Sequence, residues 1–267
     1  AKIFLWDGAS TTYNDIIEVN DGGINAMLFH QNQLYIWAGI HGNIYSWNGN
    51  LVKLKKVPFV GEGKYIEVYP GAVSVHNGVP YFGVSDGDST TVYRGVYSYG
   101  QLNKNYPISL NFDHPISTGT VQGTAVMVSA LKGISPSQFY IGWQNGSGTV
   151  GVDQVSTSLF NTSARYESLI FDDKQPYKQK YTTIVKASFR SLATGESIAI
   201  EYKLDNNASW TALGTASFTS DGAVTEKRFT TDWRAKEIQL AAVMAGSGTT
   251  APKITSLGMM FSPEDFI

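Results

Sequence analysis

The chain has 267 residues, a net charge of −2 and only 16% charged residues. It lacks the basic excess that nucleic-acid binding requires, so we exclude that class of function. It has no cysteine, which excludes disulfide scaffolds, thiol catalysis and zinc–thiolate sites. Its apolar runs are far shorter than the ~20 residues of a membrane-spanning helix.

The first residues resemble part of a repeat that occurs later in the chain. Ile3–Gly8 (IFLWDG) matches Ile44–Gly49 (IYSWNG), and neither a charged start nor a cleavage site of a signal peptide is present. We therefore expect the chain to be a fragment or a mature product, with one or more preceding copies of the repeat missing.

The clearest copy of the repeat is Asn32–Gly49 (NQLYIWAGIHGNIYSWNG). Its aromatic and β-branched runs, bounded by Gly and Asn, predict an antiparallel hairpin. Asn77–Gly100 has the same plan with a longer connection, and Gln138–Asp153 is a third, degraded copy. The repeat indicates the architecture of the chain and does not by itself indicate a chemical activity.

Each copy begins with a short apolar strand that contains a small residue, at Ile24–Phe29, Gly71–Val75 and Thr124–Val128. The copies recur at about the ~40–50-residue period of four-stranded propeller blades. Leu51–Leu54 and Ile108–Leu110 would supply outer strands. Three to four blade-like repeats are fewer than most closed propellers need. Either earlier blades are missing, or another chain or domain covers the open edge.

The sequence pattern changes near Asn161. From there, longer strands in which apolar and polar residues alternate replace the hairpins bounded by glycine. The expected strands are Thr182–Arg190, Ser197–Lys203, Thr225–Thr231, Glu237–Met244 and Ile254–Phe261. No helical stretch is expected. The fold class predicted is all-β: a partial or incomplete β-propeller over 1–160, followed by a jelly-roll-like β-sandwich over 161–267.

The tightest carboxylate groupings are Asp86/Asp88 and Asp172-Asp173. Alternate oxygen side chains around Asp86 could surround a hard cation, but the later acidic ligand of an EF-hand loop is missing. An elongated hairpin turn explains that segment better. Neighbours in a strand point to opposite faces, so Asp172-Asp173 favours a polar turn.

The four histidines are His30, His41, His76 and His114. His30 and His76 occupy the same place in successive repeats, so they should lie on neighbouring blades rather than converge on one metal. We expect these histidines to form hydrogen bonds within turns. No elbow around a nucleophilic serine, phosphate loop or zinc-protease pattern occurs. We therefore assign no catalytic, cofactor-binding or metal-ligating residue and predict that the chain is not an enzyme.

The segment Asp205–Trp210 resembles the Asp-box of sialidase-type propellers, which is a structural hairpin turn. Asn207 stands where glycine is usual and would adopt the left-handed conformation, with Trp210 packed beneath the turn.

Several aromatic residues could stack on sugar rings, although packing between blades is the commoner use of such residues at equivalent repeat positions. They are Trp37, Trp47, Tyr97, Tyr99, Trp143 and Trp233.

Three segments of the repeats are similar to repeats in structural proteins of tailed-phage virions. They are LYIWAGIHGNIYSWNG, VPYFGVSDG and the later GVYSYG. The similarity also covers Tyr166–Asp172, Lys180-Tyr181, Thr194–Ile198 and Tyr202–Asp205. The resemblance implies a propeller followed by a β-sandwich in the tail, tail tip or connector. It also implies contacts with other virion proteins and with copies of itself, and it leaves open a role in host adsorption through a surface polysaccharide.

The function expected is therefore that of a non-enzymatic virion structural protein, located in the virion. The alternative is a carbohydrate-binding or glycoside-hydrolase-like propeller, which should present two facing carboxylates across a cleft. A third reading is a secreted bacterial propeller scaffold.

Overall fold

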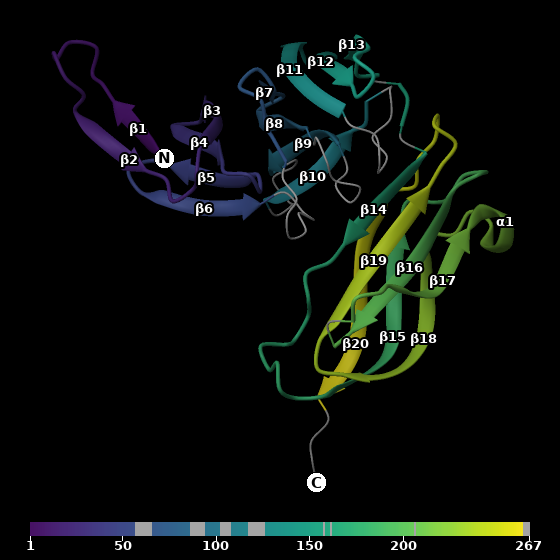
Figure 1. Cartoon of the computed structure of the whole chain (residues 1–267). Coiled ribbons are helices and arrows are strands. Elements are labelled where there is room, and N and C mark those ends of the chain that lie inside the picture. Colours follow the sequence, from purple (N-terminus) through teal and green to yellow (C-terminus); the bar gives the residue numbers. More distant parts are fainter. Residues whose placement is uncertain are drawn as a thin grey trace. The chain divides into compact units, whose positions relative to one another are not determined.

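The computed structural model describes residues 1–56, 66–85, 94–101, 108–116, 126–156, 158–160, 162–205 and 207–263. The chain divides into two compact units, Ala1–Val155 and Ser156–Ile267, and each is described by itself (Figure 1).

The first unit is a row of small antiparallel sheets, as the hairpin repeat predicts. Its strands are β1 (Lys2–Leu5), β2 (Asp15–Glu18), β3 (Ile24–His30), β4 (Gln33–Ala38), β5 (Asn43–Trp47), β6 (Leu51–Lys56), β7 (Val73–His76), β8 (Val79–Val84), β9 (Gly95–Gly100), β10 (Ser109–His114), β11 (Val126–Ser135), β12 (Gln138–Asn145) and β13 (Val150–Gln154). We call β3–β6 the first blade, β7–β10 the second and β11–β13 the third. Strand order follows the chain in each blade, and β1 and β2 form a separate two-stranded hairpin.

This arrangement is a partial β-propeller, and its sheets do not close into a ring among the described residues. The predicted outer strands are the outermost strands of their blades: Leu51–Leu54 lies in β6 and Ile108–Leu110 overlaps β10. The turn between β4 and β5 depends on Gly39, which has φ 72°. A Cβ there would lie 2.8 Å from Asp21 Oδ1, so both the backbone angle and the space require glycine.

The blades pack face to face through aromatic and aliphatic side chains. Trp37 of the first blade lies against Phe82 of the second, with ring centroids 5.2 Å apart. The second and third blades share a cluster that includes Phe139 and Val128. These buried residues explain why the repeat keeps large apolar groups at alternate strand positions.

The hairpin turns also connect neighbouring blades. His30 Nε2 lies 2.9 Å from the Gly78 carbonyl in the turn between β7 and β8. Asn77, in that same turn, donates from Nδ2 to the Pro136 carbonyl between β11 and β12 at 3.3 Å. Each turn thus bonds to the next turn along the row, which gives the His30 position the structural role expected from the sequence.

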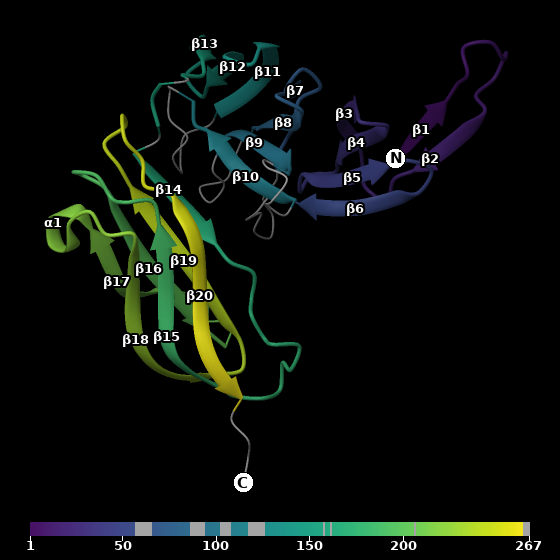
Figure 2. The ribbon, with the colours of Figure 1, turned by 180° about the vertical axis from the view of Figure 1, so that it is seen from behind.

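The second unit is a two-sheet β-sandwich of jelly-roll type. Its elements are β14 (Ser163–Glu167), β15 (Lys180–Phe189), β16 (Ser197–Leu204), β17 (Thr211–Ser217), α1 (Phe218–Asp221), β18 (Glu226–Ala235), β19 (Ile238–Ala245) and β20 (Ile254–Pro263). One sheet has the order β14-β19-β16-β17 and the other β18-β15-β20. Figure 2 shows the second sheet from behind, with β15 between β18 and β20.

The core of the sandwich lies between the two sheets. Alternate residues of β15 and β16 point inward, among them Val185, Ile198 and Ile200, each at most 1% exposed. Tyr202 stacks on Trp233 with ring centroids 3.9 Å apart. This alternation is the period-two pattern that the sequence shows for strands with one wet face.

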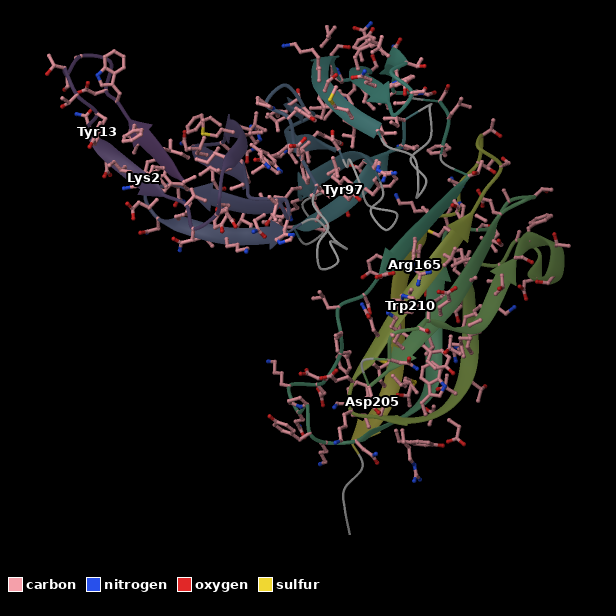
Figure 3. All side chains as sticks on the ribbon, viewed as in Figure 1. Lys2, Tyr13, Tyr97, Arg165, Asp205 and Trp210 are labelled. Carbon is pink, nitrogen blue, oxygen red and sulfur yellow. The ribbon has the colours of Figure 1, made fainter. Side chains whose placement is uncertain are left out.

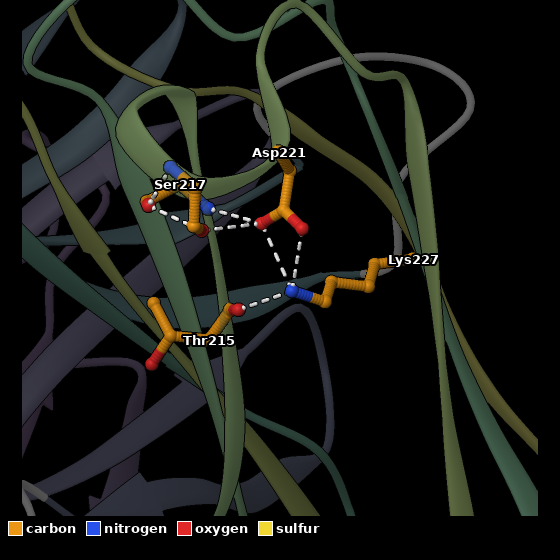
Figure 4. A network of polar contacts seen from close by, with 5 residues as sticks. Thr215, Ser217, Asp221 and Lys227 are labelled. Carbon is orange, nitrogen blue, oxygen red and sulfur yellow. Dashed lines mark hydrogen bonds and ion pairs between the residues drawn. The ribbon is translucent and has the colours of Figure 1, made fainter.

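The expectation of an entirely non-helical chain is wrong by one turn. Ser217 caps α1 by accepting a hydrogen bond from the Ser220 N–H, and its own N–H donates to Asp221 Oδ2 at 2.9 Å. Lys227 Nζ donates to both Asp221 carboxylate oxygens and to the Thr215 carbonyl (Figure 4). The serine cap and the buttressed carboxylate hold a turn too short to be stable alone.

Candidate functional site

The third blade has a face that no other described part of its unit covers, with exposed apolar side chains on β13 and exposed Lys132 and Gln154 at one end. Register places Val150 opposite Gln144 and Met127, and Val152 opposite Gly142 and Ala130. The opposite face of the same sheet packs on the second blade. Val150 is 71% exposed and Val152 is 72% exposed. We call this surface the terminal blade face.

The first blade has a second uncovered area, at the other end of the row. Met27 and Phe29 of β3 share a face with Ile36, and they are 49% and 66% exposed. Ile36 itself is buried by the β1–β2 hairpin through Ile17. The hairpin therefore covers the outer part of this face and leaves its inner strand, β3, uncovered. We call Met27 and Phe29 the leading blade face.

Both surfaces present exposed apolar side chains. Within the row, equivalent faces are buried against the adjacent blade, because stacking neighbouring repeats buries a face that one repeat cannot bury alone. Large contiguous apolar patches on a protein surface mark interaction sites. The sequence could not identify them, because period-two alternation says which residues share a face and not which face is covered.

The β1–β2 hairpin adds exposed aromatic residues that the sequence reasoning did not single out. Phe4 and Tyr13 pack together with centroids 4.8 Å apart, and both are more than half exposed. Trp6 is 63% exposed, and its Nε1 donates to the Ser10 carbonyl. Figure 3 labels Tyr13 near the tip of this hairpin.

A half-buried group of titratable side chains joins the second blade to Phe139 of the third. His76 stacks on Phe139 at 4.8 Å and Tyr81 stacks on His114 at 5.8 Å. Burial, together with the charge of His76, lowers the pKa of His114 to about 4. Burial and the neighbouring Asp113 raise the pKa of Tyr81 to about 12, and burial also raises the pKa of Asp113. At neutral pH the His114 ring is uncharged, as its aromatic surroundings require.

The aromatic residues considered for sugar stacking are instead used in packing. Trp37 is fully buried and Tyr97 is 3% exposed. Trp143 and Tyr99 pack against the clusters between blades, Trp47 packs under the β1–β2 hairpin, and Trp233 packs in the sandwich core. Trp37 and Tyr97 are buried, and the other four rings are partly exposed.

Trp210 lies on the sandwich (Figure 3), and two positively charged side chains lie over its ring. The Arg165 guanidinium is 4.7 Å from its ring centroid and Lys203 Nζ is 4.8 Å away. Arg165 also forms ion pairs with Glu167 and Glu201. The ring is therefore part of a charged surface network, in which cation–π contacts already occupy it.

The Asp-box expectation is wrong about which residue turns the chain. Asp205, and not Asn207, has the left-handed backbone, with φ 49°. Asp205 Oδ1 accepts hydrogen bonds from the N–H groups of Lys236 and Glu237 at 2.6 and 3.1 Å. The aspartate thus fixes the end of β16 to the turn between β18 and β19, which is a structural role.

The remaining candidates lie in turns or outside the described residues. Asp86 and Asp88 fall in 86–93, outside the described part of the chain. Asp172 accepts a hydrogen bond from the Lys174 N–H, and Asp173 has φ 53°, as in a polar turn. His41 Nδ1 is buried without a hydrogen-bond partner. Among the described residues, no three His, Cys, Asp or Glu side chains cluster as metal ligands would.

Comparisons with known proteins give no family. No protein-family model and no curated protein matches the chain. An exo-β-1,3-galactanase from Phanerochaete chrysosporium bound to galactose has a TM-score of 0.26 and 9% identity, over 94% of this chain and 71% of that one. The structure of infectious bursal disease virus Gx strain has a TM-score of 0.18 and 11% identity, over 91% and 73%. Similarity at this level assigns no activity.

Within the described residues, no helix has the length and hydropathy needed to span a bilayer.

Proposed function

We propose that this chain is a non-enzymatic structural component of a bacteriophage virion, in the tail, tail tip or connector. Its role is assembly, with host adsorption as a further role. The observation that carries the proposal is the pair of uncovered apolar blade faces at the two ends of the row. The resemblance of the blade phrases to tailed-phage structural repeats supplies the setting.

Burial of apolar side chains at these faces would contribute to assembly. Burying an exposed valine or phenylalanine side chain contributes about 1.5–3 kcal/mol. Val150, Val152, Met27 and Phe29 are each at least 49% exposed, so contact with another sheet can bury four large apolar groups. Joining two chains costs rotational and translational freedom, and a particle with many symmetric copies repeats the contact at each position.

The partners proposed are copies of this chain and other virion proteins. The terminal blade face of one copy would lie against the leading blade face of the next, as blades do within one row. For adsorption, the proposed ligand is a host surface polysaccharide, and the exposed rings of the β1–β2 hairpin, Phe4, Trp6 and Tyr13, are the groups suited to it.

The direct test uses purified tailed-phage particles whose genome encodes this chain. Particles banded on a density gradient and washed in high salt are digested and analysed by mass spectrometry. The proposal predicts peptides of this chain at a fixed ratio to the other tail proteins. Finding its peptides only in the soluble part of the lysate would overturn the virion assignment.

A double variant tests whether the chain is incorporated into particles through the terminal blade face. V150K with V152K places two charges on the terminal blade face, where both side chains already point to solvent. The double variant is expected to fold and to be incorporated less. T211K, a substitution at an exposed position of β17, is the matched control and should be incorporated normally. Equal incorporation of both variants would rule out this face.

A further inference from the structure

Within the described part of the second unit, the sandwich has seven strands of a fold that normally has eight. A jelly roll has two four-stranded sheets, and the connectivity of β14 to β20 follows its last seven strands. In that pattern the first strand pairs with the last one. Here the last strand is β20, and among the described residues it pairs only with β15. Among the described residues of this unit, one long edge of the sandwich therefore has backbone N–H and C=O groups that no strand pairs.

The other three edges of the sandwich carry features that oppose further pairing. β14 bears Arg165 and Glu167, and at the β17 edge the Thr215 carbonyl accepts a hydrogen bond from Lys227 Nζ at 2.7 Å. β18 carries five charged residues, Glu226, Lys227, Arg228, Asp232 and Arg234. Charges and blocked backbone groups are the usual protection of edge strands.

β20 lacks protection by charge, and its only interruptions are Pro263 at its end and Thr255, an extra residue in the pairing with β15. Its sequence, ITSLGMMFSP, contains no charged residue. Leu257 and Met259 point into the sandwich core, whereas Met260 is 65% exposed on the other face. Gly258 has open space around the position of a Cβ. An uncharged ten-residue edge of this kind is a template for another strand.

We propose that β20 pairs antiparallel with β20 of a second copy across a two-fold axis, forming a continuous six-stranded sheet. In an antiparallel pair related by a two-fold axis, each residue lies opposite a partner residue whose side chain is on the same face of the sheet. The axis therefore passes beside a residue that lies opposite its own copy. Centring on Gly258 puts Met259 beside the partner's Leu257, and Met260 beside the partner's Ser256. An uncharged strand creates no like-charge pair against itself, and it offers no charge with which to select a foreign strand. This dimer rests on the sandwich alone and stands whether or not the chain belongs to a virion.

Cysteine cross-linking tests the register. The chain has no cysteine, so G258C introduces a single thiol. In the proposed pair the two Cβ atoms at position 258 lie about 4.5–5.5 Å apart, close to disulfide geometry. Mild oxidation should convert G258C to a covalent dimer on a non-reducing gel, while T211C, exposed on β17, remains mainly monomeric. Equal cross-linking of the two variants would overturn the pairing.

Light scattering tests the dimer itself, using V150K with V152K as the background so that the terminal blade face does not contribute. This protein should have twice the 29.1 kDa mass of the chain, and adding G258K should return it to the mass of one chain. Adding T211K instead should leave the dimer intact. A monomer before G258K is added would overturn the proposal, and so would a dimer that survives G258K. A monomeric background that binds a strand peptide at β20 would assign the edge to a foreign strand instead.

Discussion

The Ser85 hydroxyl accepts a hydrogen bond from the Val128 N–H at 2.8 Å and donates one to the Val128 carbonyl at 3.3 Å. Ser85 follows the second strand of the second blade and is 3% exposed, whereas Val128 lies in the first strand of the third blade. One side chain thus satisfies two backbone groups of its neighbour. The terminal blade face lies on the far side of that same sheet, so this bond helps to orient it.

Replacing Ser85 by alanine should lower the free energy of unfolding by about 1–3 kcal/mol, because the Val128 N–H stays buried without a partner. Urea denaturation followed by near-ultraviolet circular dichroism measures the change. S129A is the control, since the Ser129 hydroxyl bonds the Gly142 carbonyl in an exposed position. Equal loss in the two variants would mean that the Ser85 bond has no special role.

Gly83 should not tolerate a methyl group. A Cβ there would lie 2.3 Å from Val128 Cγ1, so G83A should cost about 1–3 kcal/mol of stability through overpacking. G22A, where a Cβ meets nothing within 4 Å, should be close to neutral. V128A added to G83A removes the Val128 methyl groups, which approach the added carbon most closely, but leaves the Cβ of residue 128 at 2.7 Å. The loss of unfolding free energy in the double variant should then be smaller than the sum of the losses in the two single variants. A loss equal to that sum would contradict a close contact between residues 83 and 128.

The first unit should lose stability in mild acid through His114. Its folded pKa is about 4, below the ordinary 6.5, so the folded state binds fewer protons than the unfolded state between these values. Stability from this group is therefore complete above pH 6.5 and falls as the pH drops toward 4. The raised pKa of Asp113 acts in the opposite direction, so the comparison must be made against a variant.

H114F keeps an aromatic ring and removes the proton site. Denaturation curves between about pH 4 and pH 7 should show a smaller acid loss for H114F than for the unmodified chain. H30F, which changes the histidine bonded to Gly78, should keep the full acid loss. An unchanged pH dependence in H114F would show that His114 titrates normally.

Asp221 should stabilise the sandwich at neutral pH. Its pKa is lowered from 3.8 to about 2 by hydrogen bonds, first from Lys227 and then from the Ser217 N–H. A depressed carboxyl pKa contributes stability above the ordinary value, which is lost as the pH falls through the folded value. D221N should therefore lower the thermal midpoint at pH 7, and the deficit should shrink as the pH falls from about 4 toward 2. D15N, at an exposed aspartate, should show neither effect.

The sequence was informative where packing follows a local pattern. Asn32–Gly49 predicted β4 and β5, and the alternation of Ser197–Lys203 predicted β16, because each pattern reflects one buried face. It missed β14 and β17. All five residues of β14 are exposed, so the backbone of β19 and not a buried side chain recruits this strand. Leu213 is the one large residue of β17, and Gly214 makes room for the Phe229 ring.

The candidate sites were harder to find, for a physical reason. Exposure of Val150 and Val152 depends on which sheet lies against their face, and an uncovered face has the same alternation as a covered one. The open edge of β20 depends on strand order across the whole sandwich. Asp205 has a left-handed backbone, and its carboxylate accepts hydrogen bonds from two N–H groups that lie far away in the sequence, which no local pattern shows.

If the end faces of the blade row are assembly surfaces, copies of the chain should associate through them. The most direct measurement is the solution mass of the G258K variant by light scattering, since that variant removes the proposed β20 contact. The G258K chain should have a mass above 29.1 kDa that rises with concentration and returns to that of one chain when V150K and V152K are added. A G258K chain that stays at 29.1 kDa at every concentration would contradict the claim.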